Sequence, residues 1–274
     1  MAKEFSGPCT SSAGTEPSDS RSVAPLPWTT SSVPADLHGK VALITGVGRV
    51  GQIGHAVARG FGRAGAKLLL ADVNAVGLAD RVKEFAAEGI AAKASAGDLT
   101  QPEAARAATA AAQSHFGGLD IVVNVAGGFF SFGPFTEVKP EILDREIAVN
   151  FKTAFFMCQA AMPLLLSRGS GGGAIVNFAS IAVVRSLMHM SAYSAAKSAV
   201  AGLTRELARE YRDANVRVNA VAPATVRTAD NVAQMGDKQP LVELDEVVNT
   251  VLFLASDEAS AITGQIVPIT GKAY

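Results

Sequence analysis

From Lys40 onward, the chain alternates short apolar runs with longer alanine-rich stretches of helical spacing, and this alternation limits its fold more than any other feature. The apolar runs are nearly continuous, which is typical of strands that are buried on both faces of a parallel sheet. Six such runs are visible: Lys40–Thr45, Lys67–Ala71, Ile121–Val125, Ala174–Phe178, Val216–Val221 and Ile266–Ile269.

Helices are expected between these runs, and Pro102 and Asp245 are typical of helix starts. Repeated strand–helix units predict right-handed crossovers, and therefore an α/β fold: a Rossmann-type, doubly wound parallel sheet of about seven strands with helices on both faces. Ligands of such sheets bind at the carboxyl ends of the strands. The expected helices are Ile53–Ala64, Ala75–Glu88, Pro102–Phe116, Ile142–Leu166, Ala192–Arg212 and Asp245–Ala255.

The first 36 residues differ in composition from the rest. Residues 1–36 are rich in Ser, Thr and Pro and show neither a helical nor a strand period, so we predict a flexible extension there. Residues 37–274 are then a single catalytic domain of Rossmann type. The only tryptophan, Trp28, lies in the extension, where it either belongs to a solvated tail or docks on the domain or on a neighbouring subunit.

Charge and cysteine content exclude several classes of protein. With 24 basic and 25 acidic residues the formal charge is -1, which indicates neither a nucleic acid nor an anionic membrane as partner. Cys9 and Cys158 form no Cys-x-x-Cys pair, and the four histidines lack metal-ligand spacing, so we expect no disulfide scaffold and no metal. No uninterrupted apolar stretch approaches about 20 residues, which predicts a cytoplasmic protein without a membrane anchor.

The first apolar run leads directly into a glycine-rich segment, residues 45–54 (TGVGRVGQIG), and then into an alanine-rich helix. This context is typical of a dinucleotide loop, in which bare backbone and a helix N-terminus face a pyrophosphate. A plain strand-to-helix turn is the alternative, although it needs only one or two glycines. We predict cofactor contacts at Gly46, Arg49, Gly51 and Ile53.

The second run ends at Asp72, about twenty residues past the loop, where a carboxylate accepts hydrogen bonds from the adenosine ribose and repels a 2'-phosphate. Val73 follows instead of a basic residue, which favours NAD over NADP. Arg49 keeps NADP possible, because a guanidinium near the same ribose can hold the phosphate.

Tyr193 and Lys197 stand four residues apart on an expected helix, so their side chains share one face. Ser180 follows the run that precedes this helix and therefore lies at the edge where substrates bind. Asn150 lies in the helix before that run. A hydrolase is disfavoured, because the segment around Ser180 lacks the glycines of a nucleophile elbow.

In these motifs the chain resembles the short-chain dehydrogenase/reductase family, and in particular its 3-oxoacyl-reductase-like members, from about Leu37 to the end. The resemblance rests on Thr45-Gly46, Ile53-Gly54, Asp72, Asp98-Leu99 after a third strand, Asn124-Val125-Ala126-Gly127, Asn150, Ser180, Tyr193, Lys197 and Pro223 with Thr228. It implies cofactor contacts at Gly46, Arg49, Gly51, Ile53, Asp72, Asp98, Leu99, Asn124, Ala126, Gly127, Tyr193, Lys197, Pro223 and Thr228.

The resemblance also implies a role for each catalytic residue. Tyr193 is the general acid/base, and the Lys197 ammonium stabilises its phenolate, because a free tyrosine with a pKa near 10 is a poor base at neutral pH. Ser180 holds the reacting oxygen by a hydrogen bond, and Lys197 also grips the nicotinamide ribose. Asn150 anchors a water in the proton path to Lys197.

Two features depart from the family pattern, and a third bears on the substrate. The glycine loop is about two residues longer than usual, so Gly48 and Gly51 cannot both take the standard roles. The substrate lid, Ala229–Val242, is short and predicts an open site. Four phenylalanines crowd the segment after Gly127, which favours an apolar or ring-bearing substrate, although a loop or subunit contact explains them equally well. They are Phe129, Phe130, Phe132 and Phe135.

Together these features predict an NAD(P)-dependent oxidoreductase that transfers hydride between its cofactor and a secondary alcohol or ketone. The alternative is a regulator that binds the dinucleotide and has lost turnover; the intact Ser180, Tyr193, Lys197 and Asn150 count against it. The family commonly forms tetramers through the helices around Asn150 and Tyr193 and through the last strand, so we also expect a homo-oligomer.

Overall fold

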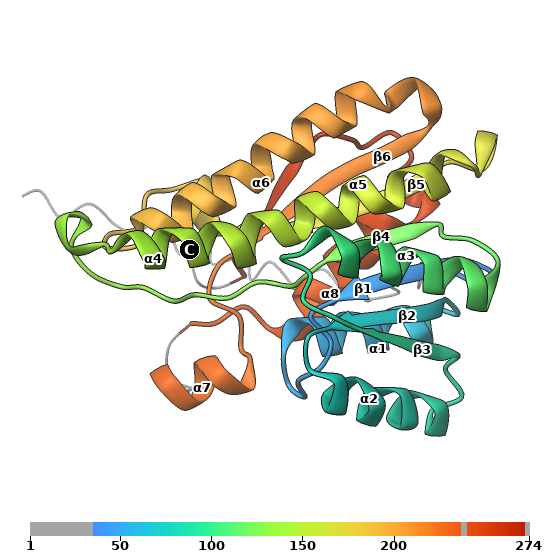
Figure 1. Cartoon of the computed structure of the whole chain (residues 1–274), viewed down its shortest axis with the longest axis horizontal. Coiled ribbons are helices and arrows are strands. Elements are labelled where there is room, and N and C mark those ends of the chain that lie inside the picture. Colours follow the sequence, from blue (N-terminus) through green and yellow to red (C-terminus); the bar gives the residue numbers. More distant parts are fainter. Residues whose placement is uncertain (1–34, 237–239, 272–274) are drawn as a thin grey trace, which may run out of the picture. The chain divides into compact units, whose positions relative to one another are not determined.

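Figure 1 shows the computed structural model of this protein, which describes residues 35–236 and 240–271. Most of the predicted N-terminal extension, including Trp28, lies outside the described residues, as do residues 237–239 of the lid. The extension and its boundary at residue 36 therefore stay predictions. Leu37, where the predicted domain begins, is already buried in the core.

Within the described residues, seven parallel strands form one sheet in the order β3-β2-β1-β4-β5-β6-β7, which confirms the predicted Rossmann-type fold (Figure 1). From β1 the chain proceeds outward through β2 to β3, and from β4 it proceeds outward in the opposite direction through β5 and β6 to β7. Such folds bind their ligands at this change of direction, beside β1 and β4. The strands are β1 (Val41–Thr45), β2 (Lys67–Asp72), β3 (Ala92–Ala96), β4 (Ile121–Asn124), β5 (Gly173–Phe178), β6 (Val216–Pro223) and β7 (Ile266–Ile269).

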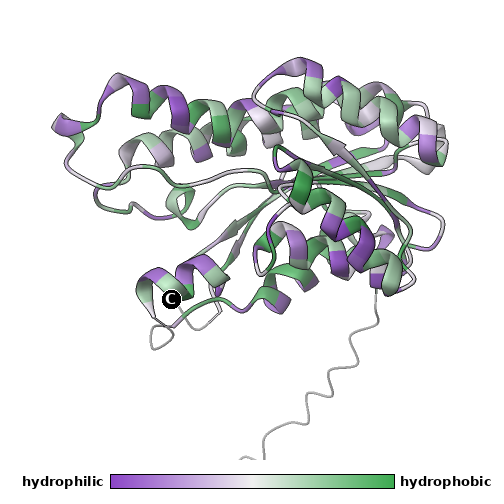
Figure 2. Cartoon of the chain, turned by 60° about the horizontal axis from the view of Figure 1, so that its bottom comes forward, coloured by the Kyte–Doolittle hydropathy of each residue, from purple (hydrophilic) through white to green (hydrophobic). Residues whose placement is uncertain are grey.

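Helices cover both faces of the sheet. Alternate side chains of each strand point to opposite faces, so Leu43 packs toward α3, α5 and α6 while Ile44 packs toward α1, α2 and α8. Figure 2 shows hydrophobic residues along the strands and hydrophilic residues on the outer sides of the helices. The helices are α1 (Ile53–Arg63), α2 (Ala75–Ala87), α3 (Pro102–Phe116), α4 (Pro140–Ile147), α5 (Thr153–Leu166), α6 (Ser191–Glu210), α7 (Ala229–Met235) and α8 (Leu244–Ala255).

The edge strand β3 is the one strand without an apolar run in the sequence. Its segment, AKASA, is largely exposed, and it pairs only with β2. An edge strand buries less of each face than a central strand does, so it needs no continuous apolar sequence. Only the family resemblance, which places Asp98-Leu99 after a third strand, anticipated it.

The single helix expected over Ile142–Leu166 is wrong in one respect, because a π-helical turn at Ala148–Lys152 separates α4 from α5. One extra residue in a turn leaves no signature in hydrophobic spacing, and such turns are common at functional sites. Among the described residues, the stretch Pro140–Leu166 is long and apolar enough to cross a membrane by length and composition alone. In this fold α5 packs against α3, β4 and β5.

The short lid contains one small helix, α7, whose first turn touches the glycine loop. The Ala229 N–H donates to the Gly51 carbonyl at 3.0 Å, and Asp230 pairs with Arg49 at 2.6 Å. The lid therefore rests on the loop that follows β1.

Candidate active site

A pocket of about 650 Å³ opens at the carboxyl ends of β1, β2, β3 and β4, where the fold predicts a ligand. The predicted cofactor contacts that line it are Gly46, Arg49, Ile53, Asp72, Asp98, Leu99, Ala126 and Gly127. Further residues line the pocket that were not predicted from the sequence, and most of them neighbour these or lie in the π-helical turn: Gln52, Gly54, Val73, Gly97, Thr100, Val125, Ala148, Val149 and Thr153.

Each glycine of the loop faces a different neighbour, so the glycines have different structural roles. Gly51 has a φ of 71°, a left-handed conformation that favours glycine, and it packs under Ala229 of the lid. A Cβ at residue 54 would overlap the carbonyl of Gly46, so α1 begins in direct contact with the end of β1. Gly48 instead lies against the Asp72 carboxylate, where a Cβ would come within 2.9 Å. Through Gly48 the lengthened loop contacts the end of β2.

The N-terminus of α1 fits a phosphate group. Its N-cap residue, Gln52, makes no side-chain cap, and the first turn contains no acidic residue. The first N–H groups of a helix carry a partial positive charge and need acceptors. Because this helix end lines the pocket, its donors suit the pyrophosphate of a dinucleotide.

Thr45 joins the glycine loop to the segment that follows β4. Its hydroxyl accepts the Ala126 N–H at 2.9 Å, and a Cβ at Gly46 would lie 3.0 Å from the same nitrogen. Two of the loops that line the pocket are therefore packed and bonded to each other.

Asp72 is held rigidly at the end of β2. Its carboxylate accepts the Gly48 N–H and the Asn74 N–H, both at 2.8 Å. Arg49 points its guanidinium to Asp230 of the lid at 2.6 Å, so the nearby carboxylate Asp230 already engages the one basic side chain of the loop. After β3, the Asp98 carboxylate accepts hydrogen bonds from the backbone N–H and the hydroxyl of Thr100, which stabilise a turn.

Some predicted cofactor residues do not line this pocket. Gly51 lies beneath the lid, and Pro223 is the buried last residue of β6. Thr228 caps α7, where its hydroxyl accepts the Asn231 N–H at 3.2 Å.

Asn124 also lies away from the pocket, in a buried polar network inside the sheet. Its amide nitrogen donates to Asn177 at 2.8 Å and to the Cys158 sulfur at 3.3 Å, and Asn177 donates to Thr204 at 3.0 Å. Burial raises the pKa of the Cys158 thiol to about 12. The network ties β4 and β5 to α5 and to α6, and α6 carries Tyr193 and Lys197.

The structure brings the four predicted catalytic residues together. The Ser180 hydroxyl lies close enough to Tyr193 to lower its pKa, and the Lys197 nitrogen lies 5.9 Å from the centre of the Tyr193 ring. Asn150 and Lys197 flank Gly127: a Cβ there would lie 2.9 Å from the Asn150 Oδ1 and 3.3 Å from the Lys197 Nζ. Residues from α6, from the end of β5 and from the π-helical turn thus converge at the carboxyl edge of the sheet.

Burial sets the electrostatics of this group. The Lys197 amine donates to the Phe178 carbonyl at 2.9 Å, and burial lowers its pKa to about 8, against the attraction of Glu146. Burial also raises the pKa of Tyr193, while the nearby Ser180 hydroxyl opposes the rise. At neutral pH Lys197 is therefore mostly a cation beside a neutral phenol.

Glu146 is the main residue of this region that the sequence analysis missed. It is completely buried one helical turn before Asn150, and the two side chains are hydrogen-bonded. Its spacing of four residues from Asn150 was the available signal, since such pairs share a helix face.

Aromatic residues surround the outer side of Tyr193. Phe129 meets the Tyr193 ring edge-on with centroids 5.4 Å apart, and Phe132 meets His189 in the same way. The Gly133 N–H donates to the His189 carbonyl, which joins the two loops that carry these rings. Phe129 and Phe132 both remain exposed to solvent.

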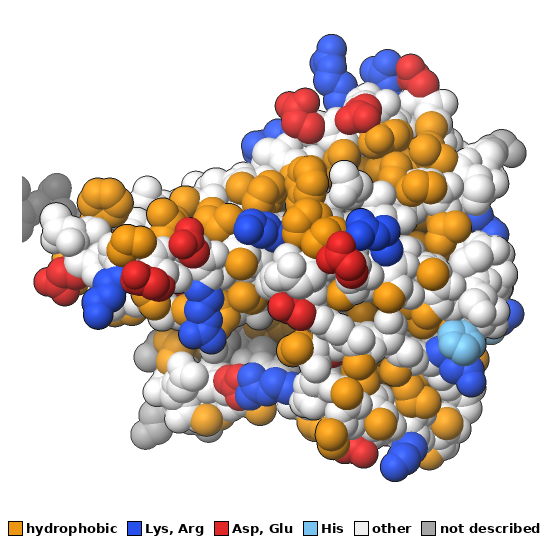
Figure 3. Space-filling model, in the orientation of Figure 1, with side chains coloured by type: hydrophobic (Ala, Val, Ile, Leu, Met, Phe, Trp, Pro, Cys, Tyr) orange, Lys and Arg blue, Asp and Glu red, His pale blue; other side chains and the backbone are white. Residues whose placement is uncertain are grey.

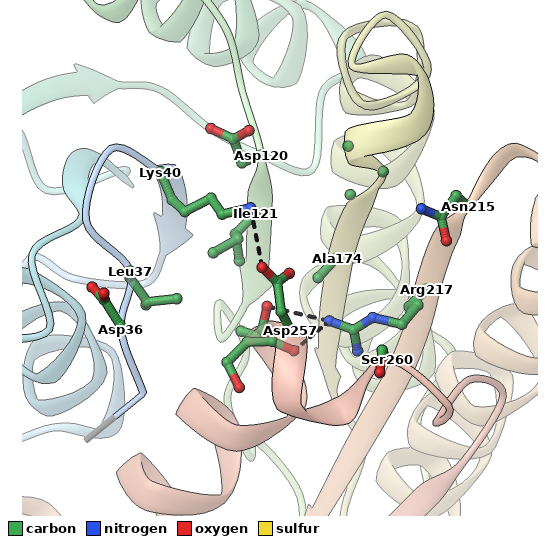
Figure 4. Close-up of a pocket in the computed structure, with 15 residues that line it drawn as sticks. Asp36, Leu37, Lys40, Asp120, Ile121, Ala174, Asn215, Arg217, Asp257 and Ser260 are labelled. Carbon is green, nitrogen blue, oxygen red and sulfur yellow. Dashed lines mark hydrogen bonds and ion pairs between the residues drawn. The ribbon is translucent and has the colours of Figure 1, made fainter. Parts of the chain in front are cut away.

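A second, smaller pocket of about 80 Å³ lies at the opposite, amino edge of the sheet (Figure 4). Its charged groups already have partners: Lys40 faces Asp257 at 3.7 Å, and Arg217 donates to the Ser256 carbonyl at 2.8 Å. Asp120 accepts the Val41 N–H at 2.8 Å. These contacts fasten the end of α8 to the sheet, so the pocket is part of the packing.

Comparison with known proteins identifies the family. A family model described as enoyl-(acyl carrier protein) reductase matches residues 46–271. A cyclohexanol dehydrogenase from Acinetobacter sp. is 36% identical over 241 residues, which cover 85% of this chain and 94% of that protein. A D-threitol dehydrogenase from Mycolicibacterium smegmatis is 34% identical over 246 residues, covering 86% and 93%.

Solved structures agree. A 7α-hydroxysteroid dehydrogenase, solved with NADH and 7-oxo glycochenodeoxycholic acid, superposes with a TM-score of 0.80 at 31% identity, covering 88% of this chain and 96% of the other. The chain belongs to the short-chain dehydrogenase/reductase family. It is an NAD(P)-dependent oxidoreductase that acts on the CH–OH groups of secondary alcohols, and a regulator without turnover is not favoured.

Proposed function

We propose that this chain transfers hydride between NAD and a secondary alcohol or its ketone, with Tyr193 as the general acid/base. The observation that supports this most directly is the convergence on Tyr193: Ser180 lies close enough to lower its pKa, and the buried Lys197 nitrogen lies 5.9 Å from the centre of its ring. A nicotinamide, when bound, supplies the hydride acceptor or donor.

Each catalytic side chain has one task in this proposal. In oxidation Tyr193 removes the proton of the alcohol, and in reduction it returns a proton to the carbonyl oxygen. Ser180 holds that oxygen by a hydrogen bond, which fixes the reacting carbon in place. The Lys197 cation favours the phenolate of Tyr193, and Asn150 anchors the water that connects Lys197 with solvent.

NAD is the proposed cofactor, and two contacts support this choice over NADP. Asp72 presents a carboxylate in the pocket at the end of β2, where it would repel a 2'-phosphate. Arg49, the nearest candidate to hold that phosphate, is paired with Asp230. The backbone of Gly46 and the first turn of α1 would hold the pyrophosphate.

The proposed substrate is apolar or carries a ring. Phe129 packs edge-on against Tyr193, so a substrate that reaches the catalytic hydroxyl passes an aromatic wall. Phe132 and Met188 expose further apolar surface near it. Cyclohexanol dehydrogenase and a hydroxysteroid dehydrogenase, whose names give ring alcohols, are among the relatives.

We also propose that the protein is cytoplasmic and forms a homo-oligomer, because members of the family commonly form tetramers. Hydrophobic side chains gather over α5 and α6 in Figure 3. On the α4–α5 stretch the large ones include Leu143, Phe155 and Leu166, each more than a third exposed. Exposed apolar surface of this kind is typical of subunit contacts.

A substrate screen tests the proposal. Purified protein is given cyclic alcohols and linear polyols with NAD and with NADP in parallel, and reduced-nicotinamide absorbance is followed. We expect turnover of ring alcohols, a preference for NAD of about tenfold or more in kcat/KM, and a kcat about 10²- to 10⁴-fold lower in Tyr193→Phe. A Tyr193→Phe variant within about tenfold of the wild type would overturn the mechanism, and a preference for NADP would overturn the cofactor assignment.

A further inference from the structure

Glu146 is a buried carboxylate whose oxygens both have partners. It lies at the end of α4 and is fully shielded from solvent. One oxygen accepts the Phe130 N–H at 2.8 Å, and the other accepts the Asn150 amide at 2.7 Å. A buried carboxylate costs free energy unless such donors compensate it, so its retention next to a catalytic group points to a role there.

The contacts of Glu146 decide which way the Asn150 amide faces. The Asn150 nitrogen donates both to Glu146 and to the Gly128 carbonyl at 2.8 Å, while its oxygen accepts the Gly128 N–H at 3.1 Å. A carboxylate only accepts hydrogen bonds, so it holds the nitrogen of Asn150 toward itself. A glutamine at the same position would place an N–H against one of the two donors.

Glu146 also supplies the negative charge that faces the catalytic cation. The charged and titratable groups around it are Arg145 on its own helix, and Lys197 and Tyr193 on α6. Arg145 points outward and stacks over the Phe130 ring at 3.9 Å. Lys197 is therefore the buried cation that Glu146 balances. Its charge raises the pKa of both Lys197 and Tyr193.

We propose that Glu146 is a positioning residue of the active site: it orients Asn150 and the segment after β4, and it sets the charge environment in which Lys197 and Tyr193 exchange protons. The role rests on the proposed function of Tyr193. It acts through Asn150 and Lys197, because its oxygens are already occupied by protein donors.

The test compares Glu146→Gln with Glu141→Gln, an exposed glutamate on the same helix. For Glu146→Gln we expect kcat to fall at least about tenfold, with the KM for NAD nearly unchanged. Removing the charge lowers the pKa of Lys197 and of Tyr193, so the pH profile of kcat moves to lower pH by about half a unit or more. Glu141→Gln should match the wild type in both measurements.

A second readout needs no cofactor. Phenolate absorbance is titrated in the free protein, with Tyr193→Phe subtracted to isolate Tyr193, and we expect its midpoint to fall in Glu146→Gln. If Glu146→Gln does not fold, Glu146→Asp carries the test: it keeps the charge but shortens the reach, so it should lower kcat without moving the pH profile.

Two results would overturn the proposal. One is a Glu146→Gln variant with wild-type kcat and an unmoved phenolate midpoint. The other is a kcat that falls equally at every pH with the midpoint unmoved, which is the mark of a purely structural role. A wild-type protein without turnover on any alcohol would instead refute the proposed function. The phenolate titration would then still test whether Glu146 acts on Tyr193.

Discussion

Gly127→Ala tests the catalytic geometry without removing any catalytic group. The φ of Gly127 is not positive, so alanine is allowed by the backbone, and the whole effect is steric. The added Cβ would lie 2.9 Å from the Asn150 Oδ1 and 3.3 Å from the Lys197 Nζ. The first distance is shorter than real Cβ atoms show, so Asn150 or the loop has to move.

The size of the effect follows from what holds these two groups. Asn150 retreats only by stretching its 3.1 Å bond from the Gly128 N–H, which is worth about 1 kcal/mol net. Overpacking adds to this, although the exposed loop relaxes part of it, so we expect a loss of about 1–2 kcal/mol in the free energy of unfolding. A displacement of a few tenths of an ångström in Asn150 and Lys197 should lower kcat by about tenfold or more.

The assay pairs urea unfolding with steady-state kinetics, and Gly202→Ala is the matched control. Gly202 lies in α6, and a Cβ there meets nothing within 4 Å. Alanine should therefore stabilise the helix by up to about 1 kcal/mol and leave kcat unchanged. A Gly127→Ala enzyme within about twofold of wild-type kcat would show that this contact does not position the catalytic groups.

Other predictions concern the cofactor, the core and pH. Asp72→Ser should shift the ratio of kcat/KM for NAD and NADP by about tenfold toward NADP; an unchanged ratio would refute the assignment of Asp72. Asn177→Ala removes the bonds to Asn124 and Thr204 and should lower the free energy of unfolding by about 2–3 kcal/mol, measured in urea; a loss below about 1 kcal/mol would contradict it. Burial lowers the pKa of His55 in the folded state, so stability should fall as the pH drops below the unfolded value near 6.5, and urea midpoints that stay constant there would contradict this.

The sequence predicted the central fold well, because burial on both faces leaves a continuous apolar signature. The strands β1, β2, β4, β5, β6 and β7 fall at the predicted runs within two residues, and α3 has the predicted bounds Pro102–Phe116. The exposed edge strand β3 left no such signature. The π-helical turn at Ala148–Lys152 left none either, because one inserted residue changes the helix geometry without changing its apolar spacing.

The site was predictable where it follows strand ends and was less so where it depends on side-chain direction. Asp72 ends β2, while Ser180 and Gly127 follow β5 and β4, and all three lie at the carboxyl edge as expected. Asn124 also ends a strand, but its side chain points toward Asn177 inside the sheet. The register of the strand determines this direction, and the sequence does not reveal the register. Glu146 was missed because a glutamate on a mostly exposed helix ordinarily indicates a solvated face.

The bond between Thr45 and Ala126 has a consequence for ligand affinity. It links the loop after β1 with the loop after β4, so two walls of the pocket are preorganised in the free protein. A ligand that binds between preorganised walls loses little of its binding free energy to ordering them. Removing the Thr45 hydroxyl would therefore weaken dinucleotide binding through entropy, even though no atom of that hydroxyl needs to touch the ligand.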